Sequence, residues 1–129
     1  MESAQDFIER YLREMRELRQ EWRQLVTRVH HRFYSADYEK QVCNSHAEHA
    51  KRIETFVSAE ASKISATVIT SQPFGKSKQQ RCRYYLAFSA DEWRITNREN
   101  ECLMCHGLGY NQIDEKPCLI CHGKGWNPL

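Results

Sequence analysis

The sequence predicts an α+β fold, in which a long N-terminal helix and shorter helices pack on an antiparallel sheet that is followed by a small metal-bound module. Three observations lead to this prediction. Apolar residues recur at a helical period near the N-terminus, strand-type residues alternate between positions 64 and 97, and four cysteines cluster after position 100. The 129 residues suffice for one hydrophobic core, and the net charge of +2 indicates neither disorder nor a surface of a single sign.

One long amphipathic helix is predicted from Ala4 to about Phe33. Its apolar positions lie three or four residues apart, which is the helical period. They are Phe7, Tyr11, Met15, Leu18, Trp22, Leu25, Val29 and Phe33. Acidic residues and arginines alternate on the opposite face, and because their charges cancel we expect a solvated face rather than a surface for nucleic acid.

Shorter helices and three strands are predicted next. Residues 38–57 return to a weaker helical period after capping-type residues at 35–37. The segments rich in β-branched and aromatic residues are 64–70, 81–88 and 93–97. Short connections rich in turn-forming residues separate them, so an antiparallel meander is expected.

An eight-residue repeat marks a second module that begins near residue 100. The segment Cys102-Leu-Met-Cys-His-Gly-Leu-Gly is repeated as Cys118-Leu-Ile-Cys-His-Gly-Lys-Gly, and four of the five glycines of the chain lie in the two copies. We therefore divide the chain into an α+β domain, residues 1–99, and a C-terminal module, residues 100–129.

The two Cys-x-x-Cys pairs predict one structural zinc ion. Zinc prefers four soft ligands in a tetrahedron, and each pair can supply two thiolates through a tight turn. The expected ligands are Cys102, Cys105, Cys118 and Cys121. Because the protein then fills all four coordination positions, no open position remains for catalysis. The two remaining cysteines, Cys43 and Cys82, are expected to be small buried or half-buried hydrophobic residues.

Residues 102–125 resemble the Cys-x-x-Cys-x-Gly-x-Gly repeats of the cysteine-rich zinc domain of DnaJ-type chaperones. That family usually carries four repeats around two zinc ions, so the resemblance implies one zinc ion for the two repeats present. The chain lacks the His-Pro-Asp signature of a J-domain. The resemblance therefore extends to the metal fold and does not imply a co-chaperone role.

Cys-x-x-Cys-His is also the attachment motif of c-type haem, with His106 and His122 as the histidines. Zinc is favoured over haem because the acidic N-terminus does not have the pattern of an export signal and because haem attachment does not require the paired glycines. A redox-active dithiol pair is a further alternative. No apolar run reaches the roughly 18 to 20 residues of a membrane span, so we expect a cytoplasmic protein with no membrane contact.

Residues 5–98 resemble the nuclear transport factor 2-like fold. The likeness rests on Arg32-Phe-Tyr-Ser-Ala-Asp-Tyr after the first helix and on the strand segments Arg83-Tyr-Tyr-Leu-Ala-Phe and Glu92-Trp-Arg-Ile. It implies a curved sheet that helices close into a cone, whose mouth would bind an apolar small molecule or a protein. Candidate lining residues are Tyr34, Tyr38, Tyr85 and Trp93, although periodic aromatic residues more often pack in a core.

Three functions compete at this stage. The leading hypothesis is a non-enzymatic protein-interaction or chaperone-like assembly protein, with an unidentified protein or a second copy of the chain as partner. The second is an isomerase-like or small-molecule-binding enzyme that uses the cone cavity, with His30, His31 and Asp37 as candidate acids or bases. The third is nucleic-acid binding through the hairpin at 76–85, whose basic residues are Lys76, Lys78, Arg81 and Arg83.

Overall fold

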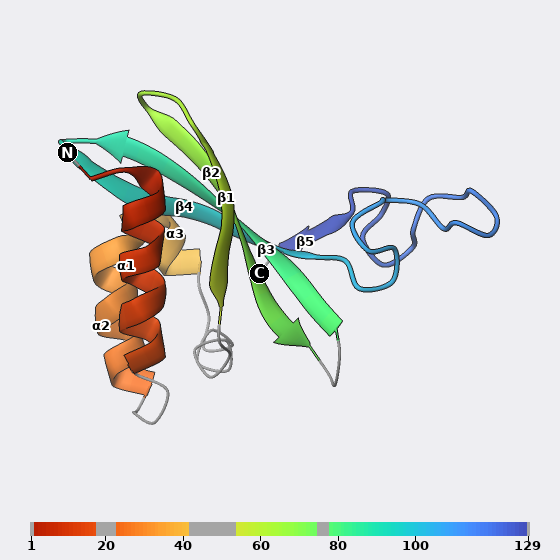
Figure 1. Ribbon diagram of the computed structural model, residues 1–129, viewed down its shortest axis with the longest axis horizontal. Coiled ribbons are helices and arrows are strands. Elements are labelled where there is room, and N and C mark those ends of the chain that lie inside the picture. The colour runs from red at the N-terminus through yellow and green to blue at the C-terminus, as the bar shows by residue number, and fades with distance from the viewer. Residues whose placement is uncertain (1, 18–22, 42–53, 75–77, 129) are drawn as a thin grey trace.

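The computed structural model describes residues 2–17, 23–41, 54–74 and 78–128, which form an α+β fold with helices on one face of an antiparallel sheet (Figure 1). The helices are α1 (Ala4–Glu17), α2 (Arg23–Phe33) and α3 (Ala36–Gln41). The strands are β1 (Thr55–Ala61), β2 (Ser65–Phe74), β3 (Lys78–Ser89), β4 (Glu92–Glu101) and β5 (Trp126–Pro128). Their order in the sheet is their order in the chain. The predicted antiparallel meander of three strands is confirmed in β2, β3 and β4, and β1 and β5 extend it at its two edges.

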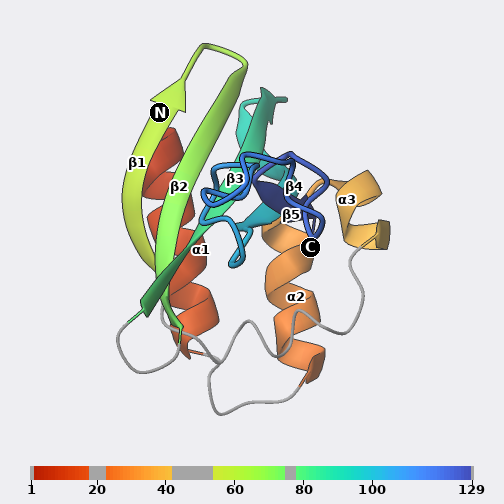
Figure 2. The same ribbon diagram turned by 90° about the vertical axis from the view of Figure 1, so that its right-hand side faces the viewer.

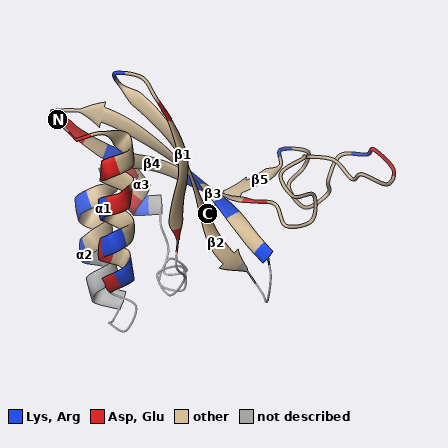
Figure 3. Ribbon diagram, viewed as in Figure 1, with Lys and Arg blue, Asp and Glu red and all other residues tan. Residues whose placement is uncertain are grey.

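The predicted single N-terminal helix is wrong, because the chain has two helices that lie side by side (Figure 2). The rings of Phe7 in α1 and Phe33 in α2 have centroids 5.3 Å apart, whereas one continuous helix would separate the two residues by about 39 Å. The apolar period is the same for a continuous and a broken helix, so the sequence pattern does not distinguish them. Acidic and basic residues alternate along α1 as expected (Figure 3).

The helix predicted over residues 38–57 is only partly confirmed. Residues 36–41 form α3, residues 42–53 lie outside the described part of the chain, and residues 55–57 belong to strand β1. Thr55, Phe56 and Val57 are residue types that favour strands, and β2 supplies the pairing partner, with Thr55 opposite Ser71. A neighbouring strand therefore decides the conformation of this segment.

A bulge in strand β4 changes which of its side chains point into the core. Its register against β3 shifts between Ile95 and Asn97, which leaves Thr96 without a residue opposite. The inward alternation shifts by one position, and Arg98 enters the core with 0% exposure. A strand that begins with the expected buried aromatic and aliphatic positions therefore ends by burying a charge.

The buried Arg98 is matched by Glu54, the residue that precedes β1. The Glu54 carboxylate accepts hydrogen bonds from Arg98 Nη2 at 3.1 Å, from Tyr84 Oη at 2.7 Å and from Thr70 Oγ1 at 2.6 Å. The guanidinium also lies 4.8 Å from the centroid of the Tyr84 ring. The core under the helices thus contains an ion pair that the sequence pattern did not predict.

The sheet is open, with β1 and β5 at its edges, and its closure into a cone remains a prediction. Three of the four aromatic residues proposed to line a cavity, namely Tyr34, Tyr38 and Trp93, are buried in the main hydrophobic cluster. Tyr85 lies outside that cluster, half-buried, and its hydroxyl donates to Glu99 at 2.7 Å. The described aromatic residues thus pack mainly as core.

Candidate metal centre

The four cysteines of the repeats meet at one buried point between the end of β4 and the start of β5. Their Sγ atoms all lie within 4.8 Å of one another, with 3.8 Å between Cys102 and Cys118 and 3.6 Å between Cys105 and Cys121. These separations exceed the S–S bond length of about 2.05 Å. They are close to the edge of about 3.8 Å in a tetrahedron whose centre lies about 2.3 Å from each sulfur. The group can therefore hold one metal ion.

Reciprocal backbone hydrogen bonds relate the two copies of the repeat. Cys118 donates its N–H to the carbonyl of Gly109 at 2.9 Å, and Cys102 donates to the carbonyl of Gly125 at the same distance. Each copy thus fixes the first cysteine of the other. The similar sequences of the two copies thus make equivalent backbone contacts, and the two Cys-x-x-Cys turns meet at the four sulfurs.

Each copy also donates a backbone N–H to its own second sulfur. The Gly109 amide lies 3.3 Å from Cys105 Sγ, and the Gly125 amide lies 3.1 Å from Cys121 Sγ. Such bonds stabilise the thiolate form that a metal ion requires. The donors are the glycines four positions after the second cysteine of each pair.

Glycine is required at position 109 for two reasons. Its φ is +83°, and a Cβ atom there would lie 2.5 Å from the carbonyl oxygen of Gly123. Gly107 and Gly123 also have a positive φ, at +82° for both. The repeated glycines therefore let the copies approach each other backbone to backbone.

The thiols do not titrate independently. Burial raises the pKa of Cys105 to about 11. Burial acts in the same direction at Cys121, but the Gly125 amide and the neighbouring thiols outweigh it and lower the pKa of Cys121 to about 7. One thiolate therefore forms near neutral pH, and a bound cation would favour loss of the remaining protons.

The module is fastened to the sheet by aromatic and charged side chains. Glu101 at the end of β4 lies opposite Trp126 of β5 in the strand pairing. Its Oε2 atom forms an ion pair with Arg81 Nη2 at 2.6 Å. The Trp126 ring lies beneath Arg83, whose guanidinium carbon is 4.3 Å from the ring centroid. The boundary predicted near residue 100 thus falls within β4, and the last described residues of the chain return to the sheet (Figure 1).

The basic residues proposed for nucleic-acid binding are largely paired. Arg81 bonds Glu101, and Arg83 Nη2 lies 2.8 Å from Glu99 Oε1. Lys78 is exposed, and Lys76 lies outside the described residues. The described part of the hairpin therefore presents little uncompensated positive charge to a phosphate backbone.

The three candidate acids and bases of the enzyme hypothesis do not share a site. His30 is buried and stacks on Tyr34 with ring centroids 4.3 Å apart. His31 is exposed beside Glu39, with Nδ1 3.2 Å from Oε2. Asp37 is exposed on α3. Two of the three therefore lie at the surface, whereas the third is buried in the core.

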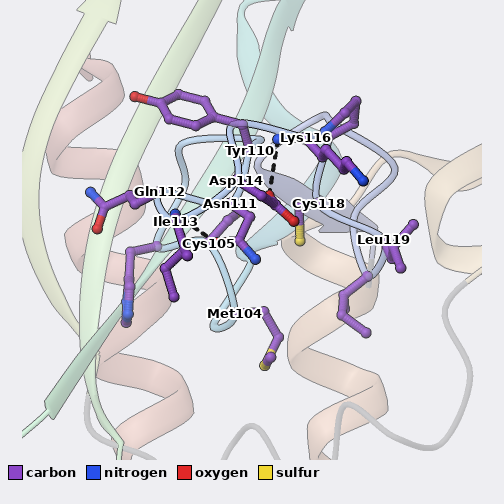
Figure 4. A pocket seen from close by; sticks show the side chains of 13 residues that line it. Met104, Cys105, Tyr110, Asn111, Gln112, Ile113, Asp114, Lys116, Cys118 and Leu119 are labelled. Carbon is purple, nitrogen blue, oxygen red and sulfur yellow. Dashed lines mark hydrogen bonds between the residues drawn. The ribbon is translucent and has the colours of Figure 1, made fainter.

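Exposed apolar side chains concentrate on the module, which our sequence reasoning missed. Among the residues that the structure describes, seven of the nine exposed large hydrophobic residues lie between positions 103 and 120. Several of them line a groove of about 590 Å³ (Figure 4). The signal was present in the repeat itself, because Leu103, Met104, Leu119 and Ile120 occupy the two positions between the cysteines of each pair.

Comparisons with known proteins add no relative, since no family model, curated protein or solved structure matches the chain. The resemblances to the DnaJ-type zinc domain and to the nuclear transport factor 2-like fold therefore remain predictions. None of the helices in the described ranges has the length and apolar character needed to cross a membrane.

Proposed function

We propose that the chain is a non-enzymatic, cytoplasmic interaction protein with an assembly or chaperone-like role, in which one zinc ion folds a C-terminal module that binds a protein partner. The four buried thiols support the metal, and the exposed apolar side chains of the module support the partner. The α+β domain carries the module between β4 and β5.

Zinc fits the donor set best. Four sulfur ligands in a closed tetrahedral arrangement are typical of structural zinc, whereas calcium and magnesium require oxygen ligands. Two c-type haems would need two separate Cys-x-x-Cys pairs, one for each haem. The two pairs instead converge on one point, which disfavours haem. His106 and His122 are exposed at turns with φ of 54° and 55°, and neither belongs to the four-residue group.

The observation that carries the proposal is the location of the exposed apolar residues. The buried centre of the module consists of the four cysteines, so a segment of this size has little apolar interior in which to place them. Contiguous exposed apolar side chains on a folded protein commonly mark an interaction surface. A site with four protein ligands also offers no coordination position for substrate or water, which disfavours zinc catalysis.

Metal analysis and affinity capture test the two parts of the proposal. Purified untagged protein should contain one zinc ion per chain, and a haem spectrum or zinc-dependent turnover with an exchangeable water ligand would contradict this. For the partner, we would compare capture from the native source by the wild type, by Leu119→Asp and by Ile64→Asp. Leu119 and Ile64 are both exposed apolar residues, but Ile64 lies between β1 and β2, outside the module.

A protein retained by the wild type and by Ile64→Asp should be lost with Leu119→Asp while the zinc content stays unchanged. Identical capture by all three forms would reject the module as the binding surface. The enzyme and nucleic-acid hypotheses gain no support from the described residues, because His31 and Asp37 are exposed and the arginines of β3 are paired.

A further inference from the structure

The metal centre forces apolar side chains outward at equivalent places in both copies of the repeat. In a Cys-x-x-Cys turn the sulfurs face the ion, so the two residues between them lie on the outside. At the first of these two positions Leu103 is 36% and Leu119 is 87% exposed, and at the second Met104 is 71% and Ile120 is 58% exposed. The module cannot bury these side chains itself without displacing the sulfurs.

The loop that joins the two copies supplies the other wall of the groove. Tyr110, Ile113 and Pro117 come from this loop, and Ile113 is 94% exposed. In Figure 4, Ile113 and Leu119 lie on opposite sides of the groove, with Met104 between them. A protruding apolar side chain and an apolar recess thus occur on one surface, which is the arrangement that an interface between identical subunits needs.

The groove carries one acidic and one basic side chain, so its charges are complementary to those of a second, identical groove. Asp114 and Lys116 are the only Asp, Glu, Lys or Arg residues among those that line it, and both are exposed. A strongly charged partner would leave one of the two opposed by a like charge. A second copy related by a two-fold axis instead sets the acid of one chain against the base of the other, twice.

We infer that this groove is the interface of a homodimer. Ile113 of each copy enters the groove of the other, and Asp114 faces Lys116 of the partner subunit. The interface is isologous, so every contact occurs twice about the axis. This inference rests on the proposed function, in which the apolar surface of the module binds protein, and it names a second copy of the chain as the partner.

Sedimentation equilibrium of the zinc-loaded full chain tests the inference. The wild type should have twice the monomer mass of 15.3 kDa at micromolar concentration. Ile113→Asp should raise the dimer dissociation constant by at least about tenfold, because it places a charge in an apolar contact. Ile64→Asp introduces the same charge at another exposed apolar residue and should leave the mass unchanged.

A charge reversal provides a second variant. Lys116→Asp should weaken the dimer by about tenfold, because four acidic groups then meet at the interface. Lys124→Asp makes the same change on an exposed residue of the module that does not line the groove, and it should have little effect. Zinc content measured on each variant verifies that the module remains folded.

A wild-type chain that sediments as a monomer would overturn the inference, as would equal weakening by Lys116→Asp and Lys124→Asp. A monomer whose captured protein is still lost with Leu119→Asp would reject the homodimer and retain the proposed function. A monomer with capture unaffected by Leu119→Asp would reject both.

Discussion

Arg98 Nη2 donates a hydrogen bond of 3.1 Å to Glu54 Oε2 inside the core, where the Arg98 side chain has no exposure and that of Glu54 has 6%. The pair connects β4 to the residue that precedes β1, although two strands, β2 and β3, lie between β1 and β4 in the sheet. Tyr84 and Thr70 contribute from the two strands between them. One carboxylate therefore links four successive strands through their core-facing side chains.

Removing one partner of this pair should strongly destabilise the fold. Arg98→Met leaves the Glu54 charge buried without its cation, and we expect a loss of about 3 to 5 kcal/mol in the free energy of unfolding. Urea denaturation followed by circular dichroism measures it. The double variant Glu54→Gln, Arg98→Met should lose less than the sum of the two single variants, because no uncompensated charge remains.

Arg94→Met provides the control for the buried pair. Arg94 forms an ion pair with Glu92 whose side chains are 34% and 59% exposed, so its loss should cost about 1 kcal/mol or less. Equal destabilisation by Arg94→Met and Arg98→Met would contradict the structural role of the buried pair.

Loss of one metal ligand should unfold the module before the rest of the chain. Cys118→Ser removes one of four sulfurs from a segment with little core of its own, so residues 102–125 should lose amide protection while α1 and α2 keep theirs. Hydrogen exchange with mass spectrometry provides the readout. Cys82→Ser also changes a buried cysteine, but one outside the four-residue group, and it should retain the full metal content.

Local patterns predicted strands β2, β3 and β4 and the cysteine group well. Cys82, Tyr84 and Leu86 alternate inward on β3 as expected, because a sheet that is covered on one face buries every second residue. The four-cysteine group was equally visible, since a tetrahedral ion would need two close pairs of thiolates wherever the rest of the chain lies. In both cases the information is contained in a few consecutive residues.

Features that depend on distant partners were missed. The apolar period runs without interruption through α1 and α2, so it did not show that they are two helices. The entry of Arg98 into the core depends on a bulge at Thr96 that only the register against β3 defines. The apolar period of residues 38–57 predicted a helix through 55–57, but these residues pair with β2 as a strand. These outcomes are fixed by tertiary pairing, which periodicity alone does not contain.

Gly109→Ala should disrupt the metal centre more than Gly123→Ala. Both residues have a φ near +82°, so both substitutions carry the cost of a left-handed residue, about 1 to 2 kcal/mol. Only at position 109 does the new Cβ collide with backbone, at 2.5 Å from the Gly123 oxygen; at position 123 its nearest neighbour is Pro117 Cβ at 3.6 Å. Competition with a zinc chelator measures the difference, and equal zinc affinities would contradict the close approach of the two copies.

Cys82 should be the least reactive of the described cysteines. Burial, and secondarily the Glu54 charge, raise its pKa from 9.0 to about 12, so at pH 8 it is a neutral thiol. After zinc chelation at pH 8, iodoacetamide should modify Cys102, Cys105, Cys118 and Cys121 but leave Cys82 intact until denaturant is added, as peptide mass spectrometry would reveal. Early labelling of Cys82 would contradict its burial.

Because the pKa of Cys82 is raised in the folded protein, the fold should become less stable as the pH rises above 9. The unfolded chain loses the Cys82 proton above about pH 9, while the folded chain keeps it to about pH 12. The stabilisation from the neutral buried thiol is therefore complete below pH 9 and decreases between pH 9 and 12. Buried Tyr11 and Tyr84, whose pKa values burial also raises, add to the loss at the alkaline end. Cys82→Ala should make the decrease shallower in urea denaturation measured from pH 8 to 11, and an unchanged slope would show that the thiol does not contribute.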